Sequence, residues 1–181
     1  DFHPTNNTMV YLLKSNDAAK KSELFRSDDN GLTWALKDNG WYVPSDFQNA
    51  IDHGGKIGVT PASQDLVYVC LIGDSKAGDQ GWIGVYKSTN NGDNWTNPTG
   101  QDGGPYGAIN GTDDWNVAAY SSGYHQGFFN FDMEVSPTDP DKLWIATIRL
   151  TESSDGGLTY QSIGAANSTR LDYVHADVQD I

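Results

Sequence analysis

One polar run near the C-terminus carries residue types that could do chemistry. An imidazole, a carboxylate and an amide stand there at alternate positions, as His175, Asp177 and Gln179. Because successive side chains of a strand point to opposite faces, these three share one face if the run is a strand. Such a face can bind a sugar, a cation or a bridging water. A strand beside a water-filled channel also carries polar residues for solvation alone, and this second explanation stays open.

A second polar run, GYHQGFFNFDMEV, leads into another predicted strand. His125 and Gln126 precede that strand, and the sequence predicts that Asn130 and Asp132 share one of its faces. If the two polar strands are neighbours, Asp132 and Asp177 can face each other. A glycoside hydrolase needs such a pair of carboxylates as its acid and its base or nucleophile. Asp132 can equally cap a turn or accept backbone hydrogen bonds, so both explanations stay open.

Aromatic side chains gather in and beside segments that are rich in Gly, Asn and Asp. Rings in such loops make platforms on which sugars stack, with their hydroxyls toward amides and carboxylates. They equally anchor long loops to the body of a protein. We expect Trp115 and Tyr124 to contact a ligand. The remaining members of the set are Trp41, Tyr42, Tyr106, Tyr120, Phe128 and Phe129.

The elements that position these residues are marked by one octapeptide, which occurs three times as SDDNGLTW, STNNGDNW and SSDGGLTY. The copies begin about 60 to 65 residues apart, and a near-constant period of this size indicates an array of repeated supersecondary units. Each copy has a serine first, Asp or Asn third, glycine fifth and an aromatic residue eighth. The positions are Ser27, Asp29, Gly31 and Trp34, then Ser88, Asn90, Gly92 and Trp95, then Ser153, Asp155, Gly157 and Tyr160.

The residue types of the octapeptide predict a tight hairpin turn. Glycine tolerates the positive φ that such a turn requires. The Asp or Asn can fold its side chain back onto backbone N–H groups of the turn. The aromatic residue then begins the outgoing strand and supplies a large apolar surface that seats the hairpin. A structural role is therefore the first expectation for these residues.

The octapeptides resemble the Asp-box, or BNR repeat, of sialidases, xyloglucan-active glycoside hydrolases and sortilin-type propellers. The second copy departs from the pattern, with Asn90 for the Asp and Asn94 for the Thr. The resemblance implies an all-β chain, built as a β-propeller fragment of about three four-stranded antiparallel blades. The run HADVQ is also similar to the His-x-Asp-x-His segment of secreted bacterial glycosidase-like families, although Gln179 replaces the second His.

Catalytic motifs of the two enzyme families are not matched. Sialidases clamp a carboxylate with three arginines, beside a Tyr nucleophile and a Glu. Arg26, Arg149 and Arg170 are the arginines of this chain, Arg26 directly precedes an octapeptide, and the F-R-I-P segment of that family is missing. Xyloglucanases use two Asp residues from different halves of a double propeller. Asp132 and Asp177 are candidates from their positions alone.

The segments around each octapeptide predict four strands per unit. GKIGVTPA, DLVYVCLIG and GWIGVYKST precede the second copy, and FNFDMEVSP, KLWIATIRL and TESS precede the third. Together with the strand after each copy, they make four-stranded propeller blades. The predicted division is a partial blade at 1–50, blades at 51–126 and 127–170, and the start of another at 171–181. Since a closed propeller needs about four blades or more, we expect a fragment. A self-contained sandwich is the alternative.

Composition limits the function classes. The formal net charge is −13, which disfavours nucleic acid and anionic membranes as partners because phosphate binding needs clustered Lys and Arg. No apolar run approaches the ~20 residues of a membrane span. Cys70 lies in the apolar run LVYVCLI and is expected to be a buried small hydrophobe. With four His and no second His beside Asp177, we expect no metal and no cofactor.

The resemblance and the loops together favour a secreted or surface-exposed bacterial propeller module. We expect it to bind carbohydrate or another extracellular protein, to associate with the remaining blades of the same propeller, and not to be catalytic by itself. The alternative is part of a xyloglucanase-like or sialidase-like glycoside hydrolase. A structural module of a large surface protein shares the same architecture and stays open, since fold does not fix function.

Overall fold

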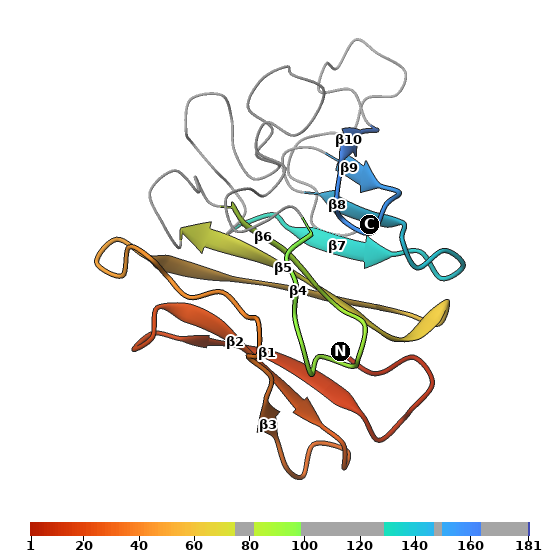
Figure 1. Cartoon of the computed structure of the whole chain (residues 1–181), viewed down its shortest axis with the longest axis horizontal. Coiled ribbons are helices and arrows are strands. Elements are labelled where there is room, and N and C mark those ends of the chain that lie inside the picture. The colour runs from red at the N-terminus through yellow and green to blue at the C-terminus, as the bar shows by residue number, and fades with distance from the viewer. Residues whose placement is uncertain (75–81, 99–128, 147–149, 164–180) are drawn as a thin grey trace.

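The computed structural model describes residues 1–74, 82–98, 129–146, 150–163 and 181, and these form ten β-strands in three antiparallel sheets (Figure 1). The described residues contain no helix, and therefore none that could cross a membrane. The predicted all-β class is confirmed. The sheets are stacked in chain order, so that the middle one has a sheet on either side (Figure 1).

Each sheet is a meander of consecutive strands. Sheet 1 has the order β1 (Val10–Asn16), β2 (Lys21–Ser27), β3 (Ala35–Leu36), and sheet 2 has the order β4 (Ile51–Thr60), β5 (Ser63–Asp74), β6 (Trp82–Ser88). Sheet 3 has four strands, β7 (Asp132–Val135), β8 (Leu143–Ala146), β9 (Leu150–Ser153) and β10 (Gln161–Ser162). Isolated bridges join Phe2 to Val10 in sheet 1 and Lys87 to Thr96 in sheet 2. These bridges stand where a fourth strand is expected.

The third unit differs from the sequence prediction in one respect. KLWIATIRL was expected to form one strand, but the chain reverses within it, and β8 pairs with β9 from Leu143↔Ser153 to Ala146↔Leu150. The prediction was wrong because the run contains no Gly, Pro, Asn or Asp to mark a turn. The division of the chain into blades at 50, 126 and 170 stays a prediction.

The core consists of two apolar layers, one on each side of sheet 2. Val67, Val69 and Leu71 of β5 pack in one cluster with Leu24 and Tyr11 of sheet 1. The alternate residues of β5 pack in a second cluster with sheet 3, whose members include Tyr68, Cys70, Met133, Leu143 and Ile145. The period of two in a strand explains this division, and β5 is apolar from Leu66 to Ile72 because both faces of this part are covered. The burial predicted for Cys70 is confirmed.

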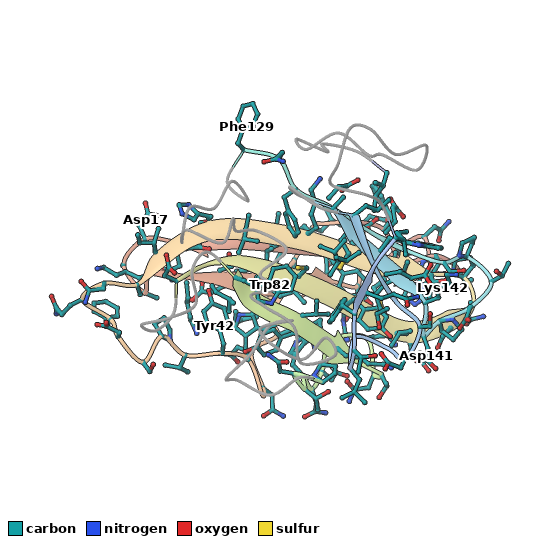
Figure 2. All side chains as sticks on the ribbon, turned by 90° about the horizontal axis from the view of Figure 1, so that it is seen from above. Asp17, Tyr42, Trp82, Phe129, Asp141 and Lys142 are labelled. Atoms are coloured by element: carbon teal, nitrogen blue, oxygen red, sulfur yellow. The ribbon has the colours of Figure 1, made fainter. Side chains whose placement is uncertain are left out.

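Figure 2 shows Tyr42 and Trp82 inside the stack, while Phe129 projects away from it. Tyr42 and Trp41, for which the sequence left both ligand contact and loop anchoring open, are 3% and 5% exposed. The Tyr42 hydroxyl accepts the N–H of Ser22 at 2.8 Å, and Trp41 Nε1 donates to the Ser22 carbonyl at 2.8 Å. For these two rings the anchoring explanation holds, because they fix the loop after β3 to sheet 1.

Candidate functional site

The three octapeptides form turns with one hydrogen-bond pattern, and we call them the Ser-Asx-Gly turns. In the first, Ser27 Oγ accepts the N–H of Gly31 at 2.8 Å and donates to Asp29 Oδ1 at 2.8 Å. Ser88 and Ser153 accept from their glycines at 2.8 and 2.9 Å. The serines are at most 1% exposed. A buried hydroxyl therefore closes each turn and supplies the acceptor that the glycine N–H needs.

The Asp or Asn at the third position folds back as expected from the sequence. Asp29 Oδ1 accepts the N–H of Thr33 at 2.8 Å, and Asp29 Oδ2 accepts the Thr33 hydroxyl at 2.6 Å. Asp155 and Thr159 repeat both bonds at the same distances. In the second turn Asn94 has no hydroxyl to donate, and the backbone bond to Asn90 remains, at 2.9 Å. The three glycines have φ values of 85° to 86°, as a turn of this kind requires.

The aromatic residues that end the turns differ in burial. Trp95 and Tyr160 are each 4% exposed, and each lies in the apolar layer between its own sheet and the preceding one. Trp34 is 40% exposed. Trp34 Nε1 donates to the carbonyl of Gly31 in its own turn at 3.1 Å, but no described sheet lies before sheet 1 to cover the ring.

The hydrogen bonds of the turn also set the acidity of Asp29. The Thr33 hydroxyl, the Thr33 N–H and Ser27 lower the pKa of Asp29 from 3.8 to about 2. Because the pKa is depressed in the folded state, the resulting stabilisation is complete above about pH 4 and is lost as the pH falls toward 2. Asn90 makes the corresponding backbone bond without a titrating group.

Replacing Asp29 with Asn is therefore expected to reduce the loss of folding stability between pH 4 and pH 2. The variant keeps an acceptor for Thr33 but no longer takes up a proton between pH 4 and pH 2. The measurement is the urea midpoint at half-unit steps across this range, with Asp17→Asn as a control at an exposed aspartate outside the turns. If the urea midpoints of the wild type and Asp29→Asn fall equally between pH 4 and pH 2, Asp29 does not have the lowered pKa.

Asp132, the candidate catalytic carboxylate, lies at the start of β7. Its side chain is 9% exposed, and Lys56 Nζ of β4 lies 3.0 Å from Asp132 Oδ1. The backbone N–H of Ile181 donates to Asp132 Oδ2 at 3.1 Å. β4 and β7 are the edge strands that begin sheets 2 and 3, and in a propeller this edge borders the central channel. Asp132 therefore joins two neighbouring sheets through an ion pair.

A second carboxylate, Asp52, occupies a similar position on β4. Ser22 of sheet 1 donates to Asp52 Oδ1 at 2.7 Å, so that Asp52 joins sheet 2 to sheet 1. Asp52 Oδ2 is out of contact with solvent and has no hydrogen-bond partner. A buried acceptor of this kind suits an internal water.

Lys56 and Asp52, in the segment IDHGGKIG, were not among the site residues predicted from the sequence. Two adjacent glycines there interrupt the strand pattern, and the pairing of β4 with β5 shifts register between Asp52 and Gly55. Irregular pairing of this kind re-aims side chains and cannot be inferred from alternation alone. Asn130 was expected within a strand, but it lies before β7 and is fully buried.

Most of the other predicted site residues lie outside the described part of the chain. The structure therefore does not place them relative to Asp132, and their roles stay predictions. Among the described residues, no group of three His, Cys, Asp or Glu side chains could hold a metal ion. The residues outside the description are His125, Gln126, Trp115, Tyr124, His175, Asp177 and Gln179.

The fold is similar to solved structures of glycoside hydrolases and of one YCF48 protein. The GH74 enzyme of Niastella koreensis superposes with a TM-score of 0.51 and 21% identity, over 92% of this chain and 22% of that one. The GH74 xyloglucanase of Xanthomonas campestris superposes with a TM-score of 0.54 and 15% identity, over 88% of this chain and 22% of that one. YCF48 of Cyanidioschyzon merolae superposes with a TM-score of 0.50 and 13% identity, over 91% of this chain and 38% of that one.

These likenesses show the fold, which is that of part of a β-propeller. The chain spans about a fifth to two fifths of the length of these proteins. No protein-family model matches the sequence. No curated protein matches it either.

Proposed function

We propose that this chain is part of an Asp-box propeller that binds glycans or another extracellular protein, and that it is not catalytic by itself. The proposal rests on the contacts that both carboxylate oxygens of Asp132 make within the protein. One carboxylate oxygen pairs with Lys56 and the other accepts the N–H of Ile181. A general acid or nucleophile must present its carboxylate to the substrate, and here both oxygens already join elements of the protein.

The Asp-box assignment is supported by the hydrogen bonds of the three Ser-Asx-Gly turns, which share the S-x-D/N-x-G pattern in sequence and in geometry. A secreted or surface location in a bacterium follows from the resemblance to Asp-box proteins, and it stays part of the proposal.

Glycan binding is supported by the polar groups on β4 and β7. The Lys56 side chain is 44% exposed and can donate to sugar hydroxyls while it holds Asp132. A neutral oligosaccharide suits this edge better than an anion, because the chain as a whole carries a formal charge of −13.

The alternative function is that of a glycoside hydrolase component in which Asp132 and Asp177 act as the carboxylate pair. Asp132 lies on the channel edge of a fold that is similar to part of GH74 enzymes. This function requires the Lys56–Asp132 pair to open when substrate binds.

One set of variants separates the two functions. Calorimetric titration with neutral plant oligosaccharides is combined with an assay of reducing-end release, for the wild type, Asp132→Asn, Asp177→Asn, Lys56→Gln and the exposed control Asp17→Asn. We expect binding without hydrolysis, and a loss of affinity of about tenfold, or 1.4 kcal/mol, in the Asp132 and Lys56 variants only. Circular dichroism checks that each variant is folded.

Hydrolysis by the wild type that Asp132→Asn or Asp177→Asn abolishes would establish the alternative. Hydrolysis retained in both variants would remove these residues from the catalytic set. If no oligosaccharide binds, and the variants behave as the wild type does, the glycan-binding proposal fails.

A further inference from the structure

Asparagine is followed by glycine at three places among the described residues, which are Asn30–Gly31, Asn39–Gly40 and Asn91–Gly92. This dipeptide is the one most prone to deamidation, because glycine has no side chain to hinder the attack of its nitrogen on the asparagine side chain. The first and third pairs occupy the fourth and fifth positions of Ser-Asx-Gly turns, whereas the second lies in the loop after β3. A fourth pair, at Asn110, lies outside the described residues.

Deamidation is a reaction of the main chain with water. A base removes the proton of the glycine N–H, the nitrogen attacks Cγ of the preceding asparagine, and an N–Cγ bond forms. The Cγ–Nδ2 bond breaks, and Nδ2 takes a proton from water and leaves as ammonia. Water then opens the resulting five-membered imide at either carbonyl, which gives aspartate or isoaspartate. The glycine nitrogen must therefore be free to lose its proton and to move toward Cγ.

The two turns hold this nitrogen in place. The N–H of Gly31 donates to Ser27 Oγ at 2.8 Å, and the N–H of Gly92 donates to Ser88 Oγ at 2.8 Å. Both serines are no more than 1% exposed, so water does not compete for these bonds. Each bond must break before the nitrogen can attack, and breaking it leaves a buried hydroxyl without its donor.

The side chain of Asn91 is restrained as well. Its Oδ1 accepts the Tyr11 hydroxyl at 3.2 Å, and its Nδ2 donates to Asp65 Oδ1 at 2.8 Å. Attack on Cγ of Asn91 would disrupt both bonds. The Asn30 side chain has no such partner among the described residues, so the bond between Ser27 and the glycine nitrogen is its main protection.

The pair in the loop after β3 differs from both turn pairs. The N–H of Gly40 donates to no acceptor among the described residues. The side chain of Asn39 donates through Nδ2 to Asn94 Oδ1, and both of these side chains belong to exposed residues. One exposed bond on the leaving amide is a weaker restraint than a buried bond on the attacking nitrogen.

We propose that Asn39 is the asparagine of these three pairs that deamidates in the folded protein. The buried turn serines, Ser27 and Ser88, protect the two turn asparagines by binding the glycine nitrogens that would attack them. The Ser-Asx-Gly turn thus has a chemical role besides its structural one, since it allows a reactive dipeptide to persist in a tight turn.

Modification of Asn39 acts on the contact between sheets 1 and 2. The Asn39 carbonyl accepts the N–H of Trp95 at 2.8 Å, and a Cβ atom on Gly40 would overlap the Trp95 carbonyl oxygen. Isoaspartate adds one methylene to the main chain at this place and turns the carbonyl that binds Trp95 into a carboxylate outside the main chain. The isoaspartate form is therefore expected to be less stable than the unmodified chain, which urea unfolding of the separated forms measures.

The test is peptide mapping by mass spectrometry of the wild-type chain after incubation at mildly alkaline pH, with and without guanidinium chloride. In the unfolded chain the three pairs are expected to react at similar rates, because they share the dipeptide. In the native chain, after division by the unfolded rates, we expect Asn39 to react at least about fivefold faster than Asn30 or Asn91. Similar relative rates in both conditions, or a faster native reaction at either turn asparagine, would overturn the proposal.

Two variants of the first turn identify the protecting bond. Ser27→Ala removes the acceptor of the Gly31 N–H and is expected to speed the reaction of Asn30 at least about fivefold, with Asn39 unchanged. Thr33→Val is the matched control, because it removes a hydroxyl bond of 2.6 Å within the same turn and leaves the serine bond intact. Circular dichroism checks the folding of both variants.

Equal acceleration of Asn30 in Ser27→Ala and Thr33→Val would count against the proposal, because general loosening of the turn would then control the reaction. An unchanged rate in a folded Ser27→Ala chain would refute the protecting role of the serine. If Ser27→Ala does not fold, the comparison of native and unfolded wild-type chains decides.

Discussion

Replacing Trp95 with alanine is expected to lower the free energy of unfolding by about 3–5 kcal/mol, whereas Trp34→Ala is expected to cost about 1 kcal/mol or less. Both residues occupy the eighth position of a Ser-Asx-Gly turn. Trp95 is 4% exposed and packs between sheets 1 and 2, while Trp34 is 40% exposed on the side of sheet 1 that no described sheet covers. The effect of the substitution is therefore set by the neighbouring sheet and not by the turn.

Urea unfolding followed by circular dichroism measures this difference. Tyr160→Ala should resemble Trp95→Ala, since Tyr160 is also 4% exposed. Equal losses at Trp34 and Trp95 would mean that the turn aromatics stabilise only their own hairpins, and the stacking of the sheets would lose its main support.

The turns could be predicted from the sequence because their chemistry is local. Ser27, Asp29 and Gly31 lie within five residues, and their hydrogen bonds need no contact beyond the octapeptide. The turn position that requires positive φ selects glycine, and an Asx side chain accepts the nearby N–H groups. The same residue types therefore recur in every copy. The all-β class followed from these turns together with the short apolar runs between them.

Contacts between sheets could not be predicted in this way. Trp34 and Trp95 have equivalent local sequences, yet within the described part of the chain only Trp95 has a neighbouring sheet against which to pack. The Lys56–Asp132 pair joins β4 to β7 across 76 positions of the chain, and a register shift in β4 precedes Lys56. Asp132 was selected for its place in a polar run, but its ion pair comes from a segment that the sequence presented as an ordinary strand.

The second large effect is expected at Gly40, which lies in the loop after β3. Its φ is +81°, and a Cβ atom added there would overlap the carbonyl oxygen of Trp95 and press on its backbone nitrogen. The N–H of Trp95 in turn donates to the carbonyl of Asn39 at 2.8 Å. Because this contact is between two backbones from neighbouring sheets, no side-chain rotamer can relieve it. Gly40→Ala is expected to cost about 2–5 kcal/mol, from strain at positive φ and from overpacking.

Gly54 provides the matched control for this contact. Its φ is +86°, and a Cβ atom there would meet nothing within 4 Å. Gly54→Ala is therefore expected to cost only the backbone strain, about 1–2 kcal/mol.

The difference between the unfolding free energies of Gly40→Ala and Gly54→Ala is the most direct test that the turn of sheet 2 packs on sheet 1. The stacked arrangement predicts that Gly40→Ala is less stable by a further 1–3 kcal/mol or so. Equal stabilities of the two variants would contradict it, because Gly40 would then have no neighbouring backbone to overlap.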